Sequence, residues 1–159
     1  MRSTESGFNE LVYLAAAQER VTEANLLLLA EPPQHVMASY VSGVAVECLF
    51  HAYRIRAGTD DTAKHDLRLH AELGSFYDGM TRRQREAVAA LISEIVSRWQ
   101  NNHRYRSWEA LREFVLKHKL HVTQGRSTTR EDVVQYNSEQ LVNAATEIIS
   151  IGVLRWDNS

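Results

Sequence analysis

The spacing of the apolar residues constrains the fold of this chain more than any other feature. Along most of the sequence these residues recur at intervals of three and four, which is the period of one helix face. The 159 residues include only seven glycines and two prolines, the residues that most often interrupt regular structure. The sequence therefore predicts an all-α protein in which strands have almost no place.

The first half of the chain predicts two long helices. One covers about residues 8–29 and stops before Pro32 and Pro33, and the next covers about residues 35–56 and stops at Gly58. Because only a short connection separates them, we expect an antiparallel hairpin.

A third long helix is expected to begin after Thr81. Thr81 and Gln84 have the spacing of a capping box, in which each side chain bonds the other residue's backbone N–H. The apolar stripe that follows continues toward His103 and Arg106, so we expect the helix to carry these residues too.

The rest of the chain predicts a fourth long helix and shorter pieces. The last helix follows Thr128 and Glu131, which again match a capping box. Short helices are expected at residues 66–76 and 108–120, and a loop at 123–129. The sequence thus predicts an antiparallel bundle of four long helices with one or two short helices.

Size and composition favour a single domain spanning residues 1–159. Hydrophobic residues make up 44% of the chain and charged residues 24%, as in ordinary globular proteins. The longest apolar run, at residues 24–30, is far shorter than the roughly 20 residues that cross a bilayer. The start of the chain has no apolar stretch typical of a secretory signal. We expect a cytoplasmic protein without a membrane span.

Charge and cysteine content narrow the functional classes. A net charge of −2 argues against coating nucleic acid through bulk positive charge, although a local basic patch is compatible with it. The single cysteine, Cys48, lies in an apolar run, so we expect a core thiol and not a nucleophile.

The segment at residues 97–106 concentrates side chains that can act on phosphate. On one continuous helix, Arg98, Asn102 and Tyr105 would share a face, whereas His103 would be turned about 140° from Arg98. One helix would therefore not bring Arg98 and His103 together on a substrate. Two copies meeting near a two-fold axis would, so we expect dimerisation to complete such a site.

The same segment resembles a known family. Arg98, His103 and Tyr105 match the R-x4-H-x-Y motif of HEPN toxins, notably those of HEPN/MNT toxin and antitoxin pairs. Residues 38–49 resemble the second helix of the family, and residues 64–67 resemble its short connector. The resemblance covers roughly the whole chain.

This resemblance implies a metal-independent endoribonuclease, a toxin or defence effector with a composite active site at a homodimer interface. His103 would transfer a proton at the ribose 2′-hydroxyl, and Arg98 would stabilise charge on the scissile phosphate. Asn102 and Arg104 would contact the phosphates of the RNA substrate. Tyr105 would be the position at which a partner nucleotidyltransferase-type antitoxin attaches AMP; another defence protein could also be the partner. No cofactor is implied.

A second interpretation uses the same residues. Trp99, Asn101, Arg104 and Tyr105 also resemble the W-x-N-x-x-R-Y pattern of non-catalytic HEPN domains. In that case the chain is a helical module that binds a nucleotide or a partner protein, and Arg104 and Tyr105 mainly hold the bundle together.

The remaining ionisable residues are interpreted as structural. Glu47 lies in a largely apolar stretch and needs a partner, for which Arg104 is the candidate. Several histidines lack the cysteine or carboxylate spacing of a metal centre, so no metal site is expected. These histidines are His65, His70, His118 and His121.

Overall fold

The computed structural model describes residues 9–59, 65–123, 126–127 and 133–158. Most of these residues, 79%, are helical, which confirms the predicted all-α class. A minimal antiparallel pair of two-residue strands, β1 (Val122–Thr123) and β2 (Arg126–Ser127), lies in the predicted loop. The helices are α1 (Glu10–Leu29), α2 (His35–Ala57), α3 (Leu67–Leu73), α4 (Arg82–Arg98), α5 (Trp108–Lys117), α6 (Val133–Asp157) and a 3₁₀ helix, η1 (Asn101–Tyr105).

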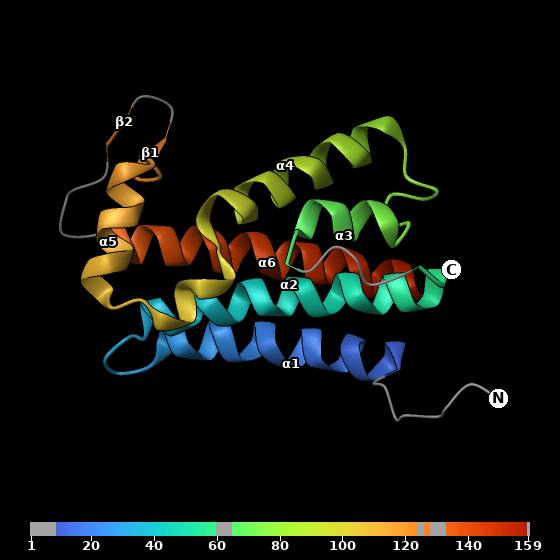
Figure 1. Cartoon of the computed structure of the whole chain (residues 1–159), viewed down its shortest axis with the longest axis horizontal. Coiled ribbons are helices and arrows are strands. Elements are labelled where there is room, and N and C mark those ends of the chain that lie inside the picture. Colours follow the sequence, from blue (N-terminus) through green and yellow to red (C-terminus); the bar gives the residue numbers. More distant parts are fainter. Residues whose placement is uncertain (1–8, 60–64, 124–125, 128–132, 159) are drawn as a thin grey trace.

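Helix α2 lies at the centre of the molecule. It packs against α1, with which it forms the predicted antiparallel hairpin, and against α6 and α3 (Figure 1). Helix α4 lies across α6, beside α3, and α5 stands at the end of the molecule where α6 begins (Figure 1). The 3₁₀ helix η1 contacts α2 and connects α4 to α5.

Local signals set most helix ends. Asn9 caps α1 by accepting from the backbone N–H of Val12, and Gly58 ends α2 in the left-handed conformation at φ +69°. The capping box of Thr81 and Gln84 is present at the start of α4, as predicted. The other predicted capping pair, at residues 128 and 131, lies outside the described residues.

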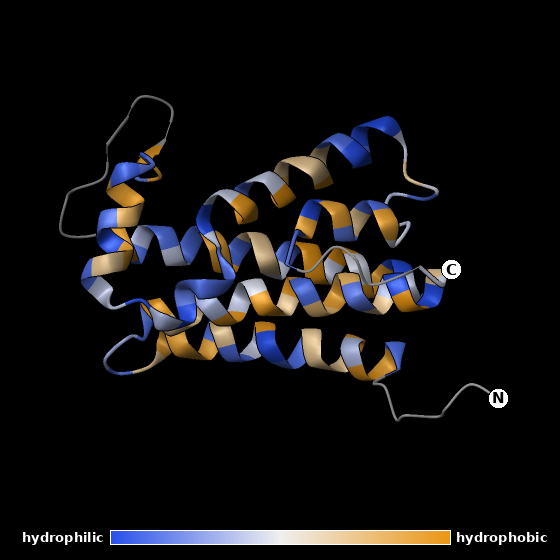
Figure 2. Cartoon of the chain, viewed as in Figure 1, coloured by the Kyte–Doolittle hydropathy of each residue, from blue (hydrophilic) through white to orange (hydrophobic). Residues whose placement is uncertain are grey.

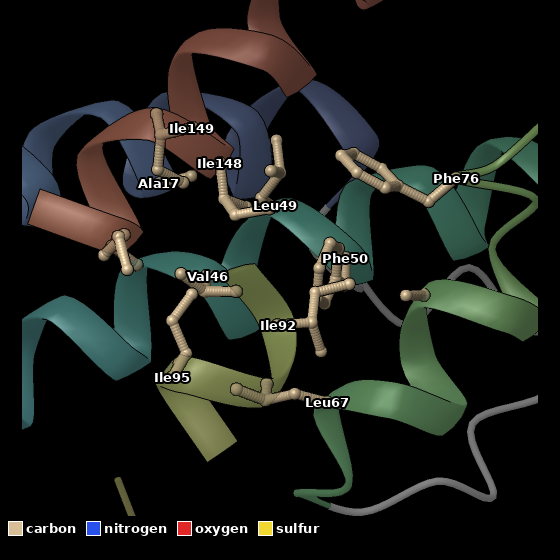
Figure 3. Close-up of a cluster of buried hydrophobic side chains, with 14 of the residues drawn as sticks. Ala17, Val46, Leu49, Phe50, Leu67, Phe76, Ile92, Ile95, Ile148 and Ile149 are labelled. Carbon is tan, nitrogen blue, oxygen red and sulfur yellow. The ribbon is translucent and has the colours of Figure 1, made fainter. Parts of the chain in front are cut away.

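The main core is built where α2 faces α4 and α6. Figure 3 shows Val46, Leu49 and Phe50 of α2 between Ile92 of α4 and Ile148 of α6, and all five are at most 2% exposed. Burial of such side chains is the main source of stability. Two smaller clusters of buried side chains lie apart from this core, one where α5 meets the start of α6 and one between α1, α2 and α6.

Helix α2 is unusually long and apolar. By length and hydropathy it is the one described helix that could cross a bilayer. However, 56% of its most apolar window is buried against the other helices, as expected of a core helix. In Figure 2, hydrophobic and hydrophilic residues alternate around α2, and it carries Glu47 and Arg54.

The prediction that one helix continues from Thr81 toward His103 and Arg106 is wrong. Helix α4 ends at Arg98, residues 99 and 100 are extended, and the chain turns into η1. Trp99 causes the break, because its indole packs into the space left by Gly43 and donates to the carbonyl oxygen of Tyr40 at 3.1 Å. Packing thus overrides the helical period at this point.

Candidate functional site

Arg98 is held inside the protein. Its side chain is 5% exposed, and its Nε donates to the carboxylate of Glu94 at 2.7 Å. Its Nη1 donates to the carbonyl oxygen of Leu120 and to Oδ1 of Asn137, both at 2.9 Å. The guanidinium therefore connects α4, the segment after α5, and α6. These contacts give Arg98 a structural role.

His103 is also inside. It is 1% exposed, its Nδ1 accepts from the backbone N–H of Gln100 at 3.3 Å, and its ring packs edge-on against Phe114. Burial, with a smaller contribution from the charge of Arg106, lowers the pKa of His103 from 6.5 to about 4. The imidazole is therefore neutral at pH 7, with its proton on Nε2 because Nδ1 accepts.

This environment limits what His103 can do. Its Nε2 is buried and has no hydrogen-bond partner among the described residues. A general base must come within hydrogen-bond reach of the proton that it removes, and the ring has almost no exposed surface. Docking of a second copy would only cover more surface, so dimerisation alone does not give RNA access to this ring.

The other three candidate residues are outside. Asn102, Arg104 and Tyr105 are exposed, and Tyr105 is 76% exposed. The guanidinium carbon of Arg104 lies 4.6 Å from the centre of the Tyr105 ring, which is a cation–π contact. We call Asn102, Arg104 and Tyr105 the η1 surface. The turn of η1 thus separates the predicted site into a buried pair and an exposed trio.

Arg104 and Tyr105 do not have the structural roles expected of them, which were to hold the bundle together and, for Arg104, to pair with Glu47. The exposure of both side chains shows that neither holds the bundle together from inside. The partner of Glu47 is His65 and not Arg104, because Oε1 of Glu47 lies 2.5 Å from Nδ1 of His65. The sequence missed this partner because the loop that positions His65 has no periodic pattern.

Glu47 also belongs to a cluster that sequence analysis did not find. Glu47 and His51, one turn apart on α2, and His70 of α3 hold their ligand atoms within 4.8 Å of one another, a spacing compatible with a metal ion. However, Nη1 of Arg54 lies 2.9 Å from Nδ1 of His70. A guanidinium only donates, so Nδ1 accepts and the proton sits on Nε2, which leaves this ring without a lone pair for a metal. His70 is therefore a hydrogen-bond partner of Arg54 in this arrangement.

Cys48 follows Glu47 on α2 and is half-buried at the edge of the core. Burial, with the neighbouring charge of Glu47, raises the pKa of its thiol to about 11. The thiolate is therefore rare at neutral pH, which fits the structural role expected of this residue.

Comparison with known proteins adds no assignment. No protein-family model, no curated protein and no solved structure matches the chain. The relation to HEPN domains depends on the residues of the sequence alone and stays a prediction.

Proposed function

We propose that this chain is a HEPN-like helical module that binds RNA through the η1 surface and does not cleave it in this conformation. One observation carries the proposal. The side chains expected to contact phosphate, Asn102 and Arg104, are exposed, whereas the expected catalytic pair, Arg98 and His103, is buried. Arg98 and His103 then serve to fix the segment that presents the η1 surface.

The η1 surface has the chemistry that single-stranded RNA requires. The exposed ring of Tyr105 offers a face on which a base can stack. Arg104, beside that ring, offers planar donors to a phosphate, and Asn102 offers an amide. Because the chain has a net charge of −2, binding should depend on these local contacts and weaken strongly with salt.

The proposed relation to HEPN domains also concerns the fold and the oligomeric state. It makes α1, α2, α4 and α6 the four long helices of an antiparallel family bundle, which the α1–α2 hairpin supports. Two copies would form a homodimer, and the protein would act on RNA in the cytoplasm. A partner protein that binds the η1 surface in place of RNA is the outcome expected if RNA binding fails.

The endoribonuclease toxin or defence effector is the second candidate. The buried Nε2 of His103 has no partner among the described residues, which is an unusual cost for a purely structural ring. Tyr105 is exposed enough for a nucleotidyltransferase-type antitoxin to modify it. This function requires RNA or a second subunit to draw His103 out of its packing against Phe114.

Fluorescence anisotropy with a labelled single-stranded RNA tests the first proposal. We expect Arg104→Gln and Tyr105→Ala each to raise the Kd about fivefold or more, since one stacked base or charge-assisted bond is worth about 1–3 kcal/mol. Arg83→Gln, which removes another exposed arginine, at the start of α4, is the matched control and should bind as the wild type does. Absent binding, or equal effects of all three variants, would contradict the proposal.

A further inference from the structure

Two large aromatic side chains are exposed close together in the chain. Tyr105, the last residue of η1, is 76% exposed, and Trp108, the first residue of α5, is 45% exposed. No other Phe, Tyr or Trp of the described residues is exposed. Residues three positions apart have Cα atoms at most about 11 Å apart. The two rings therefore belong to one small region of the surface.

The start of α5 determines the position of Trp108. Ser107 caps this helix by accepting from the backbone N–H of Ala110 at 3.2 Å, so Trp108 occupies the first helical position. The buried face of α5 lies against the start of α6 and does not include Trp108. Because aromatic side chains stabilise a fold mainly through burial, packing explains only part of the presence of an indole here.

An arginine lies one turn after Trp108 on α5. Arg112 follows Trp108 by four residues, and side chains at this spacing are neighbours on a helix surface. Arg112 is half-buried, and the structure gives it no hydrogen bond or ion pair to another described residue. Its guanidinium can therefore bind a ligand without the loss of a contact within the described part of the protein.

The pair of Trp108 and Arg112 repeats the chemistry of the η1 surface. In that surface, the guanidinium carbon of Arg104 lies 4.6 Å from the centre of the Tyr105 ring. Each pair offers a ring face on which a base can stack and planar donors for a phosphate. Two such pairs in succession match a single strand of RNA, in which every nucleotide carries one base and one phosphate.

The charges around the two pairs favour RNA over a protein partner. Residues 104–119 contain five Arg or Lys residues and two Glu, in a chain whose net charge is −2. The two carboxylates, Glu109 and Glu113, are exposed beside Arg112 and form no ion pair with it. They reduce the attraction for phosphate but leave a local excess of positive charge. The core of a protein interface is instead depleted of charged residues.

We infer that Trp108 and Arg112 form a second subsite of the RNA site, so that the ligand is single-stranded RNA with at least two unpaired nucleotides. One base stacks on Tyr105 and another on Trp108. The inference rests on the proposed function, because it extends the η1 surface. It predicts weak binding of duplex RNA, whose paired bases do not reach the two rings.

Fluorescence anisotropy at several salt concentrations tests the inference with a short labelled single-stranded RNA. Trp108→Ala should raise the Kd about fivefold or more, which corresponds to about 1 kcal/mol, the lower end of the stacking energy of one base. The slope of log Kd against log salt concentration should not change in this variant. Arg112→Gln should also raise the Kd and should reduce that slope by about 0.7, the contribution of one phosphate contact on a single strand. Trp108→Phe keeps a ring and should retain most of the affinity.

Two control variants remove exposed side chains elsewhere. Leu154→Ala removes an apolar side chain that is 67% exposed on α6, and Arg83→Gln removes an arginine on α4. Both should bind the single strand as the wild type does, and the duplex should bind more weakly than the single strand. Unchanged melting temperatures will show that all variants are folded.

The outcomes separate this inference from the proposed function. If the wild type does not bind RNA, both fail. If Arg104→Gln weakens binding but Trp108→Ala and Arg112→Gln do not, only the second subsite is overturned. Duplex RNA that binds as tightly as the single strand would also overturn it. So would a wild-type dimer that dissociates in Trp108→Ala, because the indole would then belong to a protein interface.

Discussion

Replacement of His103 by asparagine should remove much of the acid sensitivity of this fold. Asparagine can place Oδ1 near the position of Nδ1 and keep the bond from the backbone N–H of Gln100, but it does not titrate. In the wild type, burial holds the pKa of His103 at about 4 in the folded state, against 6.5 when unfolded.

The sign of the effect follows from these two values. Below pH 6.5 the unfolded chain binds a proton at residue 103 that the folded chain does not bind until about pH 4. The stability that the neutral ring contributes is therefore complete above pH 6.5 and is lost as the pH falls to 4. At about 1.4 kcal/mol per pKa unit, the loss is about 3 kcal/mol.

Urea unfolding at pH 7.5, 5.5 and 4.5 measures this effect. The free energy of unfolding should fall less with pH in His103→Asn than in the wild type, and the difference should approach 3 kcal/mol at the lowest pH. His118→Asn removes an exposed histidine that also contacts Phe114, so it should keep the wild-type slope. Parallel curves for the wild type and His103→Asn would refute the argument that the ring is buried and neutral.

Three further predictions concern packing and backbone geometry. Arg98→Met leaves buried acceptors without donors and should cost about 3 kcal/mol in urea unfolding; a loss below 1 kcal/mol would show that the guanidinium is not structural. Gly43→Ala places a Cβ 2.2 Å from the indole of Trp99 and should cost more than Gly152→Ala, whose Cβ comes no closer than 2.6 Å to its nearest neighbour, a methyl carbon of Leu49. Equal melting temperatures for these two would contradict this. Gly58→Ala should cost about 1 kcal/mol because the residue has φ +69°, and calorimetry should show a lower melting temperature.

Much of the fold could be predicted because local signals and the helical period agree. The ends of α1, α2 and α4 coincide with a cap, a glycine or a capping box, and each of these acts within a few residues. The break after Arg98 could not be predicted in this way. Residues 99–106 contain neither glycine nor proline, and the cause of the break is the fit of Trp99 to Gly43, more than 50 positions earlier.

The candidate site shows the same limit. The sequence located the correct segment, but the direction of each side chain depended on whether the helix continued. Once it stops, His103 turns inward and Arg104 outward. Likewise, physical chemistry predicted that Glu47 needs a partner but could not identify that partner. His65, which fills this role, comes from a segment without a helical pattern.

The central claim is that η1 presents an RNA-binding surface while it encloses the imidazole that cleavage would need. Incubation of a labelled single-stranded RNA with wild-type protein and with His103→Asn, followed by a denaturing gel, tests this claim directly. The account predicts full-length RNA with both proteins, and equal RNA affinity of both by anisotropy. RNA shortened by the wild type but left intact by His103→Asn would contradict it and establish the nuclease.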